Sequence, residues 1–180
     1  MFDLDSFIVD CQSARQEAEP IGAIRAVLDR ALASPGDVAA ALPATRAELS
    51  PLLTSSELTI MLATWTPGMQ TPVHDHLMSA VIGVYQGQED NDFYRSAEGG
   101  LAATTRRTIS VGQTAALGSD TIHRVTNPSS HVVAGAIHVY TGDFLATQRS
   151  VWTGEPLEQH PADGETMRKV FESANEAYER

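Results

Sequence analysis

Two histidines, His74 and His76, lie one residue apart between two apolar runs, residues 60–63 and 81–85. Residues i and i+2 of a β-strand point to the same face, so an extended His-x-His segment directs both imidazoles into one space. Two imidazoles that share a space can bind one metal ion. The alternative is a pair of histidines on a polar strand face, and the pair alone does not decide between the two.

Glycines and a third histidine place this pair in a longer pattern. Gly68 precedes the pair and completes a run of the form Gly-x5-His-x-His. Downstream, Gly112, His123 and Asn127 form a second run, Gly-x10-His-x3-Asn. The two runs together resemble the paired motifs of the cupin superfamily, whose members fold as a small double-stranded β-helix barrel.

The chain departs from the usual cupin pattern at one ligand position. The first cupin motif usually carries a glutamate three or four residues after its second histidine, where this chain has Ala80 and Val81. The resemblance therefore implies a metal site made of His74, His76 and His123 without a carboxylate. Such a ligand set is the mark of the thiol dioxygenases within the cupins.

A later stretch resembles the same subfamily. In thiol dioxygenases a Ser-x-His-x-Tyr run lies beside the iron, and here His138 and Tyr140 match while Ala136 occupies the serine position. The resemblance implies that Tyr140 donates a hydrogen bond to bound O2 or to the substrate and that His138 orients its hydroxyl. Strand alternation puts both side chains on one face. The alternative is an ordinary aromatic residue of the barrel.

Substrate binding is predicted for Arg149. Cysteine dioxygenases hold the substrate carboxylate with an arginine upstream of the first barrel strands, but residues 49–53 contain none. Arg149 matches an arginine of the bacterial 3-mercaptopropionate dioxygenases, and a guanidinium binds a carboxylate through two parallel hydrogen bonds. The alternative is a surface salt bridge. The other candidate arginines are Arg46, Arg95 and Arg124.

The predicted ligand set does not name the metal, because imidazole suits Fe, Ni, Cu and Zn alike. Three neutral ligands leave the full charge of the ion in place, which favours an anionic partner such as a thiolate. The resemblance implies Fe(II), with Ni or Zn as alternatives in the purified protein. It also implies a thiol dioxygenase that converts a small thiol acid to its sulfinate with O2. Another metal-dependent cupin enzyme, or a non-catalytic metal- or small-molecule-binding cupin, is the alternative.

Short strands must position these residues. Many short strands with regular turns between residues 57 and 153 indicate a β-barrel. Within it the pattern predicts only residues 93–95 as strand in the segment that follows Gly87. With the resemblance, this predicts an all-β (mainly β) cupin jelly-roll barrel, with N-terminal helices and one C-terminal helix.

Helical periodicity flanks the barrel on both sides. Residues 1–43 form a predicted helical N-terminal segment. Pro156 and Pro161 predict a loop, and Asp163 then caps a last helix within residues 163–180. The predicted apolar face of that helix consists of Met167, Val170, Phe171, Ala174 and Tyr178.

Composition and charge exclude several function classes. The chain of 180 residues is 42% hydrophobic, which is typical of a single globular domain over residues 1–180. A formal net charge of −11 argues against nucleic acid as a partner, since phosphate contacts need Lys and Arg. No apolar run approaches the ~20 residues of a membrane helix, and the N-terminus does not resemble a signal peptide. We expect a cytoplasmic protein, a monomer or small homo-oligomer, whose partners are a thiol and O2.

Overall fold

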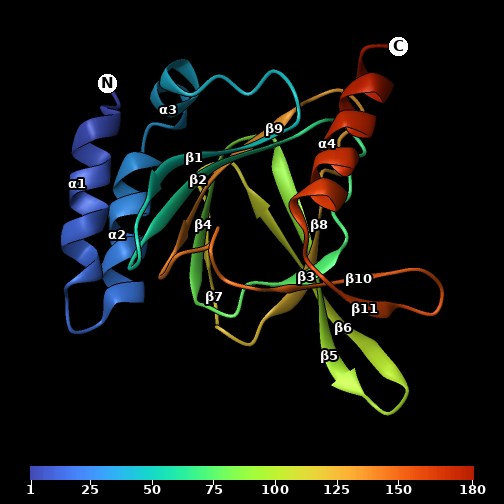
Figure 1. Cartoon of the computed structure of the whole chain (residues 1–180). Coiled ribbons are helices and arrows are strands. Elements are labelled where there is room, and N and C mark those ends of the chain that lie inside the picture. Colours follow the sequence, from blue (N-terminus) through green and yellow to red (C-terminus); the bar gives the residue numbers. More distant parts are fainter.

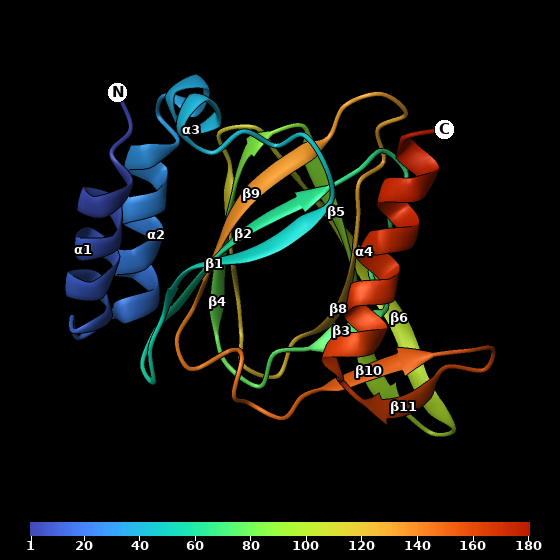
Figure 2. The same cartoon turned by 45° about the horizontal axis from the view of Figure 1, so that its top comes forward.

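Residues 48–161 form eleven strands in the computed structural model, which describes residues 1–180. The strands pair in two antiparallel sheets that face each other around a barrel interior (Figures 1 and 2). The five-stranded sheet has the order β1 (Glu48–Thr54), β2 (Thr59–Trp65), β9 (Ala134–Tyr140), β4 (Ala80–Gln86) and β7 (Thr114–Leu117). The six-stranded sheet has the order β11 (Glu158–Pro161), β10 (Ser150–Thr153), β3 (Val73–Asp75), β8 (Ile122–Thr126), β5 (Gln88–Ala97) and β6 (Gly100–Ser110).

Helices flank the barrel on two opposite sides (Figure 2). The N-terminal helices share one apolar cluster with the outer face of the five-stranded sheet. No helix is both long and apolar enough to span a bilayer. The predicted β-barrel with N-terminal helices and one C-terminal helix is thereby confirmed. The helices are α1 (Leu4–Arg15), α2 (Pro20–Ala31), α3 (Pro35–Ala41) and α4 (Gly164–Tyr178).

Strand β9 shows how the sheet sorts its side chains. Ile137 and Val139 face the N-terminal helices and belong to the outer apolar cluster. Ala136, His138 and Tyr140 alternate to the opposite face and are buried inside the barrel. Both faces of the five-stranded sheet are therefore covered. The inner face of this mostly apolar strand places two polar side chains, His138 and Tyr140, in the buried interior of the barrel.

The two sequence motifs meet at Asn127. Its side-chain amide donates to the carbonyls of Trp65 and Val132, each at 2.8 Å. Its backbone carbonyl accepts from the N–H of Gly68 at 3.1 Å, and its own N–H donates to Met69 at 3.0 Å. Gly68 adopts φ +74°, a conformation that glycine reaches without strain. These bonds hold the turn before β3 against the end of β8.

Two strands lie outside the predicted barrel limits of residues 57 and 153. Strand β1 precedes residue 57, and β11 occupies residues predicted as a loop that contains Pro161. Both are edge strands, where a proline costs no ladder hydrogen bond. Strand β1 also carries Pro51 beside an irregular register. All four residues of β11 are exposed, so it lacks the apolar alternation by which a strand is recognised.

Helix α4 is fastened to the barrel by one buried side chain. Asn175 accepts a hydrogen bond from the backbone N–H of Ala47 at 2.7 Å and donates to the carbonyl of Ala47 at 3.0 Å. The expected cap is present, because Asp163 accepts from the N–H of Thr166. Val170, Phe171 and Ala174 pack against the barrel as predicted, whereas Tyr178 is 46% exposed.

Replacing Asn175 by Ala should lower the free energy of unfolding by about 2 kcal/mol, because two buried polar groups of Ala47 lose their partner. Urea unfolding of the variant measures the change. Glu176→Ala is the matched control, since the neighbouring Glu176 is exposed. Equal midpoints for the Asn175 variant and the parent would contradict the anchoring role.

Candidate metal centre and active site

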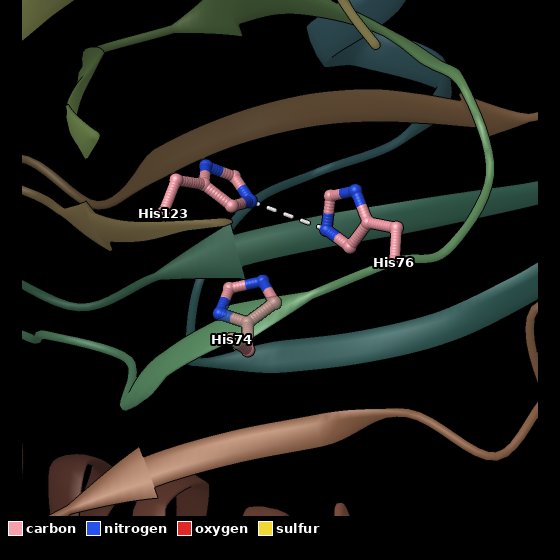
Figure 3. Close-up of side chains that lie close together, drawn as sticks. All are labelled: His74, His76 and His123. Atoms are coloured by element: carbon pink, nitrogen blue, oxygen red, sulfur yellow. Dashed lines mark hydrogen bonds between the residues drawn. The ribbon is translucent and has the colours of Figure 1, made fainter. Parts of the chain in front are cut away.

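Three imidazoles converge at one point inside the barrel (Figure 3). His74 on β3 and His123 on β8 are directly paired in the ladder between these strands. His76 follows the end of β3, and Leu77 then turns the chain with φ +56°. One ring nitrogen of each histidine lies within 4.8 Å of the other two. Strand pairing thus brings together His74 and His123, which are 49 residues apart in the sequence.

Hydrogen bonds orient two of the three rings. Nδ1 of His74 donates to the carbonyl of Pro72 at 2.9 Å, and Nδ1 of His123 donates to Oδ1 of Asn91 at 2.8 Å. These tautomers follow from partners that only accept, and they leave both Nε2 lone pairs free for a metal. Nδ1 of His76 is buried without a partner.

The donor set fits a metal ion. Nε2 of His76 lies 3.2 Å from Nε2 of His123. Two nitrogens that each lie ~2.1 Å from one ion are separated by roughly 3 Å, so this spacing suits shared ligation. His76 and His123 are 1% and 0% exposed, while His74 is partly exposed. The cluster can therefore hold a metal, with His74 on its accessible side.

Burial keeps the imidazoles in the form that binds metals. Desolvation lowers the pKa of His74 to about 4, against a smaller opposing effect of its bond to Pro72. Desolvation, followed by the neighbouring histidines, lowers the pKa of His76 and His123 well below the usual value. A lowered pKa favours the neutral ring, so all three side chains keep free lone pairs at pH 7.

One small cavity reaches this cluster. Its walls include His74, His138, Tyr140, Phe144 and Arg149. The cavity volume is about 50 Å³. A water-sized group needs roughly 10–15 Å³ by this measure, so the cavity admits a molecule of a few heavy atoms. Three residues predicted from the sequence to act on substrate thus face the same space as one predicted metal ligand.

Tyr140 is held on three sides. Its ring stacks on Phe144 with centroids 4.1 Å apart and meets the ring of His76 edge-on at 4.9 Å. Its hydroxyl lies 3.2 Å from Nδ1 of His138. Burial raises the pKa of Tyr140; Arg149 opposes this shift and Glu89 adds to it. The phenol is therefore protonated at neutral pH.

Arg149 presents a cation to the cavity. Its guanidinium carbon lies 3.7 Å above the centre of the Phe144 ring. Its Nε is buried without a hydrogen-bond partner, and it forms no salt bridge with the protein. Burial lowers the pKa of Arg149 from its usual value. The other candidate arginines, Arg46, Arg95 and Arg124, do not line this cavity.

Sequence reasoning missed two buried polar residues of β5. Asn91 orients His123, and Glu89 accepts hydrogen bonds from Trp65 and from His138. The predicted strand at 93–95 was too short, because β5 begins at Gln88. Residues 88–92 are all polar, so the sequence shows no alternation of apolar and polar residues that would indicate a strand or its buried face.

Four further residues whose side chains could bind a metal or react lie outside the cluster. Asp75 points away from the two adjacent histidines and accepts from the N–H of Ser150 at 2.8 Å, so it is not one of the clustered residues. His131 and His160 are exposed. Cys11 is fully buried, and burial raises the pKa of its thiol to about 12, which makes it an inert small hydrophobe.

Comparison with known proteins gives the family. A profile of the family described as cysteine dioxygenase type I matches residues 52–150, more than half of the chain. Protein BH2720 of Bacillus halodurans is similar with a TM-score of 0.50 and 14% identity, over 59% of this chain and 78% of that one. An RmlC-like cupin family protein with a double-stranded β-helix fold, from Methanocaldococcus jannaschii, is similar with a TM-score of 0.45 and 10% identity, over 56% and 84%.

The two facing sheets and the motif pair define a cupin with a candidate three-histidine metal centre. Within the cupins, the chain belongs to the cysteine dioxygenase type I family.

Metal content tests the centre directly. The variant with both His74→Ala and His76→Ala should lose nearly all bound metal, because one imidazole cannot hold the ion that three can. Metal analysis of purified protein measures the stoichiometry. His131→Ala is the matched control, since His131 is exposed in a loop. Parental stoichiometry in the double variant would exclude this cluster as the site.

Proposed function

We propose that the protein is a non-haem Fe(II)-dependent thiol dioxygenase, which converts a small thiol acid to its sulfinate. The net reaction adds both atoms of O2 to the thiolate sulfur and needs no external reductant. One observation carries the proposal: a single small cavity is lined by a cluster histidine, His74, by the phenol of Tyr140 and by the cation of Arg149. Membership of the cysteine dioxygenase type I family supports it.

The metal would be held by His74, His76 and His123 through their Nε2 atoms. When bound, a ferrous ion supplies coordination positions and redox chemistry that let a thiolate combine with O2. The protein's part is to keep the ligands neutral and the surroundings dry. A neutral ligand set leaves the positive charge of the ion uncompensated, which favours the thiolate over the thiol.

Arg149 would bind the substrate carboxylate. Its guanidinium is partly buried, is fixed by its contact with Phe144 and has no carboxylate partner within the protein. A buried cation without a partner is costly, so an anionic substrate that supplies one binds with that cost removed. Arginine binds carboxylates through two parallel hydrogen bonds, which would also set the direction in which the thiol end points.

Tyr140 would act on the reacting atoms. Its hydroxyl is protonated, its side chain lines the cavity, and its ring meets the ring of His76 edge-on. A phenol in this place donates a hydrogen bond to negative charge that develops on oxygen or sulfur, which is how a fixed donor lowers a barrier. In the resting site Nδ1 of His138 holds the hydroxyl oxygen by accepting its hydrogen bond, and the hydroxyl proton would turn from this nitrogen to the developing charge.

The cavity favours a thiol acid without an amino group. Residues 49–53, which contain no arginine, form part of β1, and Leu49 from this segment lines the cavity. No carboxylate lines the cavity to receive an ammonium group. We therefore expect 3-mercaptopropionate to be a better substrate than L-cysteine.

A panel of thiols tests the function. Iron-loaded protein should consume one O2 per thiol with 3-mercaptopropionate and release the sulfinate, which mass spectrometry identifies. L-Cysteine should react at least roughly tenfold more slowly. The cavity offers no carboxylate to its ammonium group, and one charge-assisted contact contributes ~1.5–3 kcal/mol. The absence of O2 uptake with every thiol would instead favour a non-catalytic metal-binding cupin or another metal-dependent cupin enzyme.

Replacing Arg149 by Ala should lower kcat/KM for 3-mercaptopropionate roughly ten- to hundredfold, at ~1.4 kcal/mol per decade. The rate with 2-mercaptoethanol should change little, because this thiol has no carboxylate to pair. Oxygen-electrode kinetics with both substrates measure the two effects. Arg124→Ala is the matched control, since Arg124 is also partly buried but lies off the cavity. Equal losses on both substrates would remove Arg149 from the binding site.

A further inference from the structure

The proposed chemistry makes no use of the most deeply buried carboxylate in the protein. Glu89 is 0% exposed and lies on β5, in the six-stranded sheet. Asp90 beside it alternates to the other face, where it accepts from Thr108 at 2.7 Å. Glu89 thus points into the barrel, while the side chain of Asp90 lies on the outer face of the sheet.

Glu89 is joined to Tyr140 by a chain of hydrogen bonds. Its Oε1 accepts from Nε1–H of Trp65 at 2.6 Å and from Nε2–H of His138 at 3.1 Å. On the other side of the ring, Nδ1 of His138 lies 3.2 Å from the hydroxyl of Tyr140. His138 belongs to β9 of the five-stranded sheet, so this chain crosses the barrel interior.

Stability does not account for a carboxylate in this position. No arginine or lysine pairs with Glu89, and its Oε2 is buried without a hydrogen-bond partner. A buried carboxylate that is incompletely paired costs free energy, and an apolar side chain of similar volume is often at least as stable. The arrangement therefore points to a role in the neighbouring site.

The geometry restricts how His138 can carry its protons. An ionised carboxylate only accepts hydrogen bonds, so Nε2 of His138, 3.1 Å from Oε1 of Glu89, then bears the hydrogen and Nδ1 is left as an acceptor. The position of Nδ1, facing Tyr140, then follows. Ala136, the inward-facing residue before His138 on β9, has no polar atom to perform this task. Without Glu89 the ring is free to flip or to change tautomer, and Tyr140 loses its partner.

We propose that Glu89 is a positioning residue, whose carboxylate fixes the ring orientation and tautomer of His138, so that Nδ1 of His138 accepts a hydrogen bond from the hydroxyl of Tyr140 and holds the hydroxyl oxygen in place beside the cavity. Trp65 holds the carboxylate itself in place, because its Nε1–H makes the shorter of the two hydrogen bonds to Oε1 of Glu89. The structural part of this proposal stands on the hydrogen-bond chain alone. Its consequence for turnover rests on the proposed dioxygenase function.

Nitrogen NMR of metal-free protein labelled with 15N-histidine tests the structural part. The parent and Asp90→Asn should show the His138 signal as the Nε2–H tautomer with slow proton exchange, assigned by its absence in His138→Gln. Glu89→Gln should shift this signal, and Glu89→Leu should abolish its slow exchange. A parent signal from the Nδ1–H tautomer, or a signal unchanged in both Glu89 variants, would overturn the proposal. Because no turnover is involved, this result does not depend on the enzyme's activity.

Kinetics of iron-loaded protein test the consequence. Glu89→Leu should lower kcat roughly ten- to hundredfold, as loss of an orienting partner does in metal sites, with KM for 3-mercaptopropionate nearly unchanged because Arg149 is intact. Glu89→Gln should recover part of the loss, and Asp90→Asn should match the parent. In a Tyr140→Phe background, Glu89→Leu should cost nothing further, because both changes remove the same function.

Full additivity of these two substitutions would refute a role through Tyr140. If Glu89→Leu does not fold, the comparison of Glu89→Gln with Asp90→Asn decides in its place, and equal kcat values would refute the proposal. A parent protein that oxidises no thiol would contradict the proposed function but leave the NMR test of Glu89 valid.

Discussion

The pairing of β3 with β8 is the constraint on which the centre depends. It sets His74 directly opposite His123 and brings His76 within 3.2 Å of His123. Three imidazoles this close together in a dry interior cannot all be charged, and burial lowers the pKa of each one. The same exclusion of water that would make three isolated histidines costly thus prepares them as neutral ligands.

Several contacts around the centre maintain that pairing or satisfy a buried polar group. Asn127 ties the turn before β3 to the end of β8. Asn91 accepts a hydrogen bond from Nδ1–H of His123, which leaves Nε2 of that ring free for a metal. Helix α4 adds Met167 to the cavity wall and packs Phe171 against Trp65, with ring centroids 5.6 Å apart. The two sheets fix the positions of the histidines, and helix α4 covers part of the cavity.

How much of this could be predicted from the sequence depends on how local each signal is. The His-x-His pair follows from strand alternation, and the motif spacing adds His123, so the cluster was foreseeable. Strands β1 and β11 were not, because edge strands with proline or without apolar alternation leave no local pattern. The partners Asn91 and Glu89 lie in a polar run, and only pairing between distant strands shows which of its residues face inward. Phe144, the platform under Arg149, is likewise a long-range contact.

Charge balance gives a physical reason for the combination of residues around the cavity. On the proposed function, a divalent ion with three neutral ligands contributes two positive charges and Arg149 one more, and no carboxylate lines the cavity. A thiol acid bound as thiolate and carboxylate compensates two of these charges, and buried charges are tolerated when they are paired. L-Cysteine adds an ammonium group, which leaves one more positive charge uncompensated in a low-dielectric space, where such an imbalance is costly. The absence of an arginine from residues 49–53 already predicted that L-cysteine is a poor substrate, and electrostatics leads to the same expectation. Leu49, the residue of this segment that lines the cavity, is uncharged, so it pairs neither with the carboxylate nor with the ammonium group of L-cysteine.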